Sequence, residues 1–123
     1  MYYLLMLLRQ YRLKKRVAFN ATYRLNNTLH INGITVFLGK KKNNNLPTKI
    51  GFVVSKKIHK RAVVRNRIKR LMRESVRLYI KNTVDFDTQY VSIIFVASAK
   101  LLNKNFKYVD CSVGNIMEKI IHV

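Results

Sequence analysis

Residues 50–75 read IGFVVSKKIHKRAVVRNRIKRLMRES, and the spacing of the apolar residues changes within this stretch. The first six residues, Ile50–Ser55, are mostly β-branched or aromatic, which favours a strand. From about Lys60 to Lys81 the apolar residues recur every three or four positions, which predicts a helix. The inward-facing residues of this helix fall within about 100° of arc at about 100° per residue. They are Val64, Ile68, Leu71, Met72, Ser75 and Tyr79.

Two shorter elements precede this stretch. Residues 15–25 favour a helix, because Phe19 and Tyr23 are four positions apart and share a face. Ile34–Leu38 predicts a strand, since its large side chains alternate between the two sides.

Two polar segments are interpreted as connections. Asn26-Asn27 is typical of a turn. Residues 40–47, with the sequence KKKNNNLP, form a polar segment of low complexity. Its simplest interpretation is a hairpin loop that joins the strand at 34–38 to the strand at 50–55.

Two elements follow the long helix. Tyr90–Ala97 is a nearly uninterrupted apolar run, as expected for a strand that is buried on both faces. Residues from Asn103 to about Ile121 form a weaker amphipathic helix. The order α-β-β-α-β-α, with room for one more short strand, predicts an α+β fold: a small α/β sandwich of helices against one sheet. Residues 1–123 form a single domain.

The first eight residues, Met1–Leu8, are an apolar N-terminal extension. They are too few to span a bilayer. They also lack the basic start and the small-residue cleavage site of a signal peptide. We expect an extra segment packed on the domain, or an upstream extension of the real start. No membrane partner is expected.

Positive charge is the strongest compositional feature. Lys and Arg total 25 against 5 Asp and Glu, a formal net charge of +20. All five acids lie at or after Glu74, so residues 1–73 contain 19 basic residues and no acidic one. A folded chain with so much unpaired charge repels itself, and a polyanion that releases counterions on binding relieves this repulsion. The distribution therefore predicts a nucleic-acid partner.

The basic residues of the long helix recur on one side. Arg65, Lys69, Arg73 and Arg77 are spaced four apart and are predicted to lie opposite the apolar arc, widened by Arg67 and Arg70. A helix face that serves only solubility normally carries both acidic and basic side chains, which pair four positions apart. On this helix only Glu74 offers an acidic partner. Arg suits phosphate binding because its planar fork holds two oxygens at once.

Residues for protein-based catalysis are not evident. The three His residues are scattered, and Asp85 and Asp87 fall in a loop, where a turn-forming role is expected. No metal ligand set is recognisable. Cys111 is the single cysteine, so it has no disulfide partner in the chain, and we expect it to pack as a small hydrophobe in or beside the last helix. The sequence predicts no catalytic side chain and no protein-bound metal.

The residues from Ser55 to Ser75 closely resemble the signature of the bacterial ribonuclease P protein subunit. Arg65-Asn66-Arg67 matches the Arg-Asn-Arg core that opens the long helix in that family. Upstream, RLKK at residues 12–15 resembles part of the opening helix, as does Phe19. The flanking strands and the last helix also fit, so the resemblance covers most of the chain.

The resemblance implies a ribonucleoprotein in which a catalytic RNA, with Mg²⁺ held mainly by that RNA, removes the 5′ leader of precursor tRNA. It also implies a ribosomal-protein-like fold with a left-handed β-α-β crossover. One protein surface would dock on the catalytic RNA through Lys56, Lys57, Arg61, Arg65, Asn66, Arg67, Lys69, Arg70 and Arg73. A cleft between the first helix and the sheet would receive the leader through Lys14, Lys15, Phe19, Tyr23 and Phe37.

Several alternatives stay open at this point. The three aromatic residues of the cleft can stack on bases or only pack in the core. The chain can instead be a structural ribosomal protein or a general DNA-compacting protein. Its Asn-, Lys- and Ile-rich composition suits either a bacterial cytoplasm or an organelle matrix.

Overall fold

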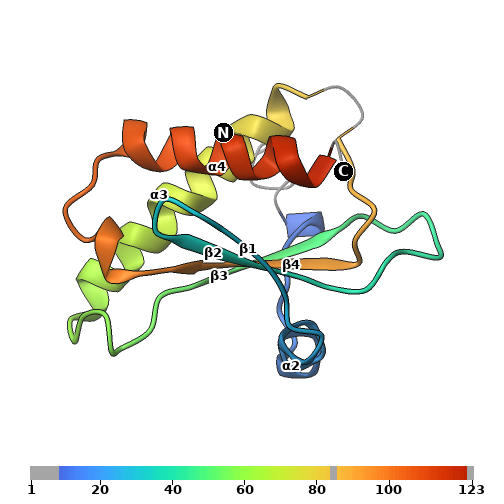
Figure 1. Ribbon diagram of the computed structural model, residues 1–123, viewed down its shortest axis with the longest axis horizontal. Coiled ribbons are helices and arrows are strands. Elements are labelled where there is room, and N and C mark those ends of the chain that lie inside the picture. The colour runs from blue at the N-terminus through green and yellow to red at the C-terminus, as the bar shows by residue number, and fades with distance from the viewer. Residues whose placement is uncertain (1–8, 84–85, 122–123) are drawn as a thin grey trace.

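The computed structural model describes residues 9–83 and 86–121 (Figure 1). The predicted N-terminal extension lies outside the described residues. The order of helices and strands is α-β-β-β-α-β-α, which confirms the predicted α+β class and includes the one further strand. The elements are α2 (Arg16–Arg24), β1 (Asn27–Ile31), β2 (Ile34–Leu38), β3 (Lys49–Val53), α3 (Ala62–Lys81), β4 (Ser92–Ala97), a short 3-10 helix η1 (Ala99–Leu101) and α4 (Phe106–Ile121).

The strands form one sheet in the order β1-β2-β4-β3. β2 is antiparallel to both β1 and β4, whereas β3 is parallel to β4. Asn32 and Gly33 connect β1 to β2 and have φ angles of 49° and 87°. Positive φ at both central residues defines a type I′ turn, whose twist suits a two-residue hairpin.

Two predicted connections are wrong. Asn27 belongs to β1, and only Asn26, with φ of 51°, has the left-handed backbone expected of a turn after α2. Residues 40–47 are not a hairpin loop, because β4 lies between β2 and β3. Lys41 instead forms an antiparallel bridge with Tyr90, just before β4. The hairpin interpretation failed because it assumed that strands close in sequence are neighbours in the sheet.

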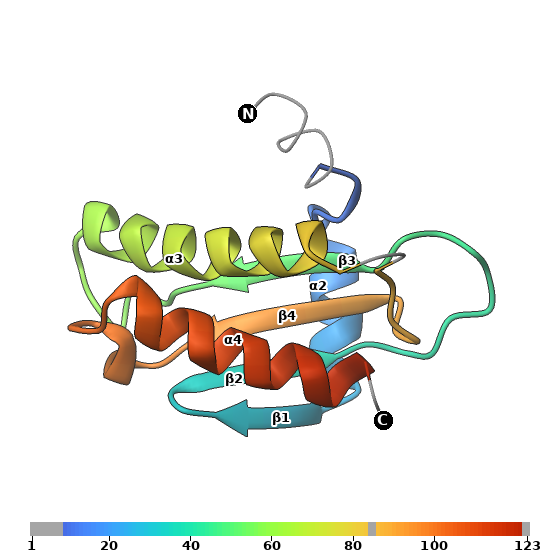
Figure 2. The ribbon, with the colours of Figure 1, turned by 90° about the horizontal axis from the view of Figure 1, so that it is seen from above.

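The unit β3-α3-β4 is a left-handed crossover. Figure 2 views it from the helix side, with both strands pointing the same way and α3 returning above them. When the strands are turned to point upward, β4 lies to the left of β3, which defines the left hand. Such crossovers are rare, because the strand twist favours the opposite hand. The predicted left-handed crossover is confirmed, and it places α3 over the β3 edge of the sheet.

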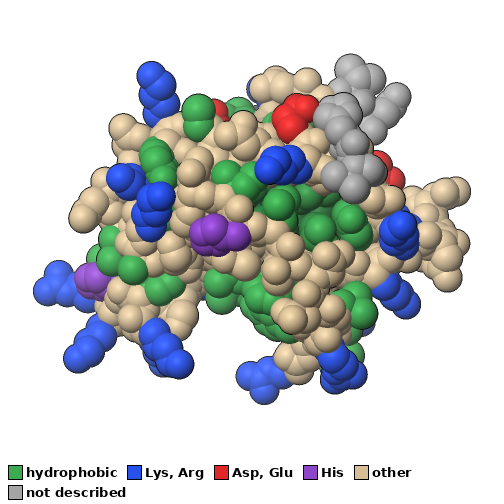
Figure 3. Space-filling view, in the orientation of Figure 1, with side chains coloured by type: hydrophobic (Ala, Val, Ile, Leu, Met, Phe, Trp, Pro, Cys, Tyr) green, Lys and Arg blue, Asp and Glu red, His purple; other side chains and the backbone are tan. Residues whose placement is uncertain are grey.

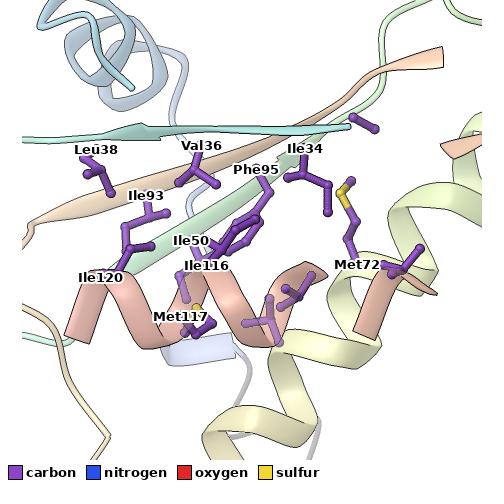
Figure 4. Close-up of a cluster of buried hydrophobic side chains, with 14 of the residues drawn as sticks. Ile34, Val36, Leu38, Ile50, Met72, Ile93, Phe95, Ile116, Met117 and Ile120 are labelled. Atoms are coloured by element: carbon purple, nitrogen blue, oxygen red, sulfur yellow. The ribbon is translucent and has the colours of Figure 1, made fainter. Parts of the chain in front are cut away.

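The core lies between the sheet and the pair α3 and α4, which cover the same face (Figures 1 and 2). Figure 4 shows side chains of both layers directed into this space. The sheet contributes Ile34, Val36, Leu38, Ile50, Ile93 and Phe95, and the helices contribute Met72, Ile116, Met117 and Ile120, all of them buried.

The inward face of α3 includes one polar side chain. Ser75 is buried, and its Oγ donates a hydrogen bond of 2.6 Å to Oδ1 of Asp110 in α4. This bond links the two helices and satisfies the hydroxyl in a low-dielectric setting. The other residues predicted on this face are buried or half-buried, and the structure adds Val76 and Ile80 to them.

α2 packs on the opposite face of the sheet (Figure 1). Its buried residue, Thr22, donates from Oγ1 to the Ala18 carbonyl at 2.8 Å, and this Oγ1 lies 2.5 Å from Ser92 Oγ in β4. The ring of Phe19 lies against Gly51 of β3, where an added Cβ would be 2.7 Å from two ring atoms. Gly51 therefore permits the close approach of α2 to β3.

Gly51→Ala should lower the free energy of unfolding by about 1–3 kcal/mol, because the new methyl group overlaps Phe19 and displaces α2. Gly114→Ala in α4 is the matched control, since an added Cβ there meets no atom within 4 Å. Ala is also the better helix former by roughly 0.8–1 kcal/mol. Urea denaturation measures both changes. Equal stability of the two variants would contradict the packing of Phe19 on Gly51.

Candidate nucleic-acid interface

Part of the sheet face that carries α2 is open to solvent. The strand registers place Gly51, Ile94, Phe37 and Thr28 in the row nearest α2. The next row consists of Val53, Val96 and Thr35, which are half-buried, and His30, which is exposed. Figure 3 shows a hollow on this side, between α2 and the segment that leads into α3, and hydrophobic side chains form its floor against the sheet.

Three aromatic residues form the wall of this open strip. Phe19 and Tyr23 of α2 have ring centroids 6.5 Å apart, and Tyr23 meets Phe37 of β2 edge to face at 4.9 Å. All three are half-buried, so each packs on the protein and still presents part of its ring. Burial raises the pKa of the Tyr23 phenol, which keeps this hydroxyl neutral. The structure thus brings together the three aromatic residues that were predicted for a cleft.

Basic residues stand on both sides of the open strip, before α2 and after β3. Lys14 and Lys15 are exposed immediately before α2. Lys56, Lys57 and Arg61 are exposed in the segment between β3 and α3. Figure 3 shows Lys and Arg side chains on both lobes that border the hollow. The strip is therefore an apolar and aromatic floor between cationic rims, the combination that binds single-stranded nucleic acid.

The basic residues of α3 do not form the single outward stripe that was predicted. Arg65 turns back and donates from Nη1 to the carbonyls of His59 and Lys60, at 3.0 and 2.6 Å. Arg77 forms an ion pair with Glu74. Both arginines are half-buried, because residues spaced four apart drift around the helix relative to the core.

The fully exposed part of α3 is narrower than predicted. Among the residues predicted to bind the catalytic RNA, Asn66, Arg67 and Arg70 are exposed, whereas Lys69 is half-buried. Arg73 is also half-buried and points toward the β3 edge, where it lines a pocket with Phe19. We define Asn66, Arg67 and Arg70 as the outer face of α3.

The cations of the interface are not neutralised by the described acids. Within residues 9–83 and 86–121, two ion pairs form, Lys42–Asp87 and Arg77–Glu74. Arg77 belongs to the predicted basic stripe, but neither pair uses a residue that the resemblance assigned to the catalytic RNA or to the leader. Asp110 accepts a hydrogen bond from Ser75, and Glu118 accepts one from Tyr79. The remaining described acids therefore take part in hydrogen bonds between α3 and α4. The unpaired charge that the sequence predicted is therefore present at the surface.

The described residues contain no group of three or more His, Cys, Asp or Glu side chains that could hold a metal ion. Asp87 accepts from Lys42 and from the Thr88 N–H; although burial raises its pKa, these contacts lower it overall. Asp85 lies outside the described residues. Cys111 is exposed on α4, so its predicted packing as a hydrophobe is wrong. No described helix is long and apolar enough to cross a membrane.

Sequence reasoning missed several residues beside this interface. His30 and Thr35 share a contact of 2.9 Å at the end of the open strip. Lys100 stands next to the β1-β2 turn, within 3.0 Å of where a Cβ on Gly33 would lie. His30 could not be placed while β1 was unrecognised, although Asn32-Gly33 is a strong hairpin signal.

Comparison with known proteins identifies relatives over nearly the whole chain. The model of the family described as Ribonuclease P matches residues 7–121. The "Ribonuclease P protein component" of Clostridium novyi is 35% identical over 109 residues, which are 88% of this chain and 91% of that protein. The protein of the same name from Clostridium kluyveri is 34% identical over 112 residues, 89% of this chain and 93% of its own.

Solved structures share the fold. The RNase P protein of Staphylococcus aureus superimposes with a TM-score of 0.72 at 24% identity, covering 89% of this chain and 94% of that one. The RNase P protein of Thermotoga maritima gives a TM-score of 0.71 at 23% identity, covering 89% and 96%. Because the family model matches residues 7–121 and the two relatives are more than 30% identical, the chain belongs to the ribonuclease P protein family.

Proposed function

We propose that this chain is the protein subunit of a ribonuclease P ribonucleoprotein and assists the removal of the 5′ leader from precursor tRNA. The observation that carries the proposal is the pairing of an unneutralised cationic surface with an open, aromatic-walled strip of sheet. Two RNA surfaces of different chemistry suit a protein that holds one folded RNA and one single strand. Membership of the family supports the same assignment.

The outer face of α3 and the preceding segment are proposed to dock on the catalytic RNA. Arg67 and Arg70 are exposed and have no carboxylate partner among the described residues. Arg65 contributes indirectly, because its hydrogen bonds to His59 and Lys60 hold the segment against the start of α3. Lys56 and Lys57 extend the positive surface from that segment.

The open strip beside α2 is proposed to receive the leader. Its floor is shallow and half-buried, and an extended single strand can lie along it with bases against Tyr23 and Phe37. A duplex presents its bases in a stack and cannot use these rings in the same way. Lys14 and Lys15 would contact the phosphate backbone of the leader on the α2 side of the strip.

Phosphodiester hydrolysis is proposed to occur on the RNA. The described side chains offer no set of carboxylates suited to Mg²⁺, so we propose that the RNA holds this ion, which supplies charge neutralisation and an activated water when bound. The protein residues would position the leader and reduce repulsion between the two RNAs. The site of action is then wherever precursor tRNA is processed, a bacterial cytoplasm or an organelle matrix.

Reconstitution tests the proposed function. The full chain alone should not cleave precursor tRNA, whereas its addition to the cognate catalytic RNA at low Mg²⁺ should raise the cleavage rate, because its cations reduce repulsion between the RNAs. Cleavage assays with and without each component measure this. Equal cleavage by the protein without RNA would contradict the proposal, as would no stimulation of the RNA.

Replacement of both Arg67 and Arg70 by Ala should weaken binding to the catalytic RNA. It should also reduce the slope of log K against log[salt] by up to about two units, because up to two phosphate contacts are lost. Lys107→Ala with Lys119→Ala removes the same charge from the exposed surface of α4 and is the control. Salt-dependent binding titrations compare the two. The docking assignment fails if both pairs change the slope equally.

Phe37→Leu should weaken binding of precursor tRNA by roughly 1–3 kcal/mol, because a base loses its aromatic platform. Binding of mature tRNA, which has no leader, should be unchanged. Tyr23→Phe keeps a ring in the wall and serves as the control. Affinities of the reconstituted complex for both RNAs provide the measurement. Equal losses for precursor and mature tRNA would show that Phe37 acts on the fold rather than on the leader.

A further inference from the structure

A second recess lies at the β3 edge of the sheet, outside the open strip. It is a pocket of about 300 Å³ between α2 and α3, and its lining includes Tyr11, Arg12, Phe19, Gly51, Phe52 and Arg73. Phe19 is the residue that this pocket shares with the aromatic wall of the strip. Phe19 also stands in the wall of the strip proposed for the leader, and Arg73 belongs to the helix that carries the outer face, so the pocket lies between the two proposed RNA surfaces.

The outer wall of the pocket is fixed by backbone pairing. The segment around Arg12 runs parallel to β3, with Leu13 N–H donating to the Ile50 carbonyl at 2.9 Å and Ile50 N–H donating to the Tyr11 carbonyl. The Tyr11 ring is held edge to face against Phe86, with centroids 5.7 Å apart. The wall is therefore part of the folded domain and preformed.

The floor of the pocket exposes an aromatic ring and a strand edge. Phe52 is half-buried and stacks on Phe95 with centroids 5.6 Å apart, so its ring is held in place from the core side. Backbone groups alternate between the two edges of a strand, and those of Ile50 bond outward to residues 11–13. The N–H of Phe52 then points to the same outer edge, as a donor available to an oxygen ligand.

Positive charge converges on the pocket. Burial lowers the pKa of Arg73, and the neighbouring charges of Arg12 and then Arg70 lower it further, so these guanidinium groups are close enough to repel one another. Neither ion pair of the described residues includes any of these arginines. Cations brought together without a counter-ion favour an anion between them.

We propose that this pocket binds one nucleotide of single-stranded RNA, with its phosphate between Arg12 and Arg73 and its base or ribose against Phe19 and Phe52. The volume lies at the small end of ligand pockets and suits a single unit of a chain rather than a folded element. The inference rests on the proposed function and adds a binding site to it. The nucleotide comes either from the leader or from an unpaired segment of the catalytic RNA, since both offer the same chemistry.

The test uses the full chain reconstituted with its catalytic RNA and compares Arg12→Ala, Arg73→Gln and their combination. Arg12 is exposed, so its replacement tests the pocket even if loss of the half-buried Arg73 destabilises the fold. Lys107→Ala with Lys119→Ala is the charge-matched control for the combination, and Lys107→Ala alone is the control for each single variant. Two affinities are measured: that of the protein for the catalytic RNA, and that of the complex for tRNA with leaders of increasing length.

If a leader nucleotide occupies the pocket, the variants should lower the affinity of the complex for tRNA with long leaders about tenfold. Their binding of mature tRNA and of the catalytic RNA should be unchanged. A nucleotide of the catalytic RNA predicts a similar fall in protein affinity for that RNA, with leader length immaterial. Either result supports the pocket. Variants that match the control in both assays would overturn it while leaving the proposed function intact. Wild-type protein that binds neither RNA would overturn both.

Discussion

The parallel pairing of β3 with β4 is the constraint on which the other features of the molecule depend. Parallel neighbours need a crossover, and here α3 provides it over the face opposite α2. The left hand of the crossover puts α3 above the β3 edge (Figure 2). Three features consequently lie next to one another around one edge of the sheet: the basic helix, the aromatic wall at α2 and the pocket between them. The residues that line this pocket come from positions as far apart in the sequence as Arg12 and Arg73.

Charge and core have separate roles in this arrangement. The core between the sheet and the helices α3 and α4 is apolar and well buried, so stability does not require the surface cations to be paired. The described acids are used in contacts of their own, such as Ser75–Asp110 between α3 and α4. The positive surface is left for an external polyanion, at the cost of self-repulsion in the free protein.

Local patterns predicted most elements, whereas pairing and orientation needed the structure. Ile34–Leu38 and the apolar face of α3 follow from periodicity, because each buries one side against one layer. β1 was missed because its residues, NTLHI, are largely exposed, although Asn32-Gly33 marks the hairpin. The loop at 40–47 was misread because sheet order depends on contacts distant in sequence. Arg65 and Arg73 were predicted to lie opposite the apolar arc but are half-buried, because a helical wheel does not show what lies beside a helix.

The central claim is that the leader of precursor tRNA lies on the face of the sheet that carries α2, and not along α4. Site-specific crosslinking in the reconstituted complex tests this directly, since the natural Cys111 is exposed on α4. A photo-crosslinker would be attached to Thr35→Cys in a Cys111→Ser background, and separately to native Cys111. We expect the label at position 35 to join to the leader of precursor tRNA, whereas the label at Cys111 should not. Leader crosslinks from Cys111 and none from position 35 would contradict the claim.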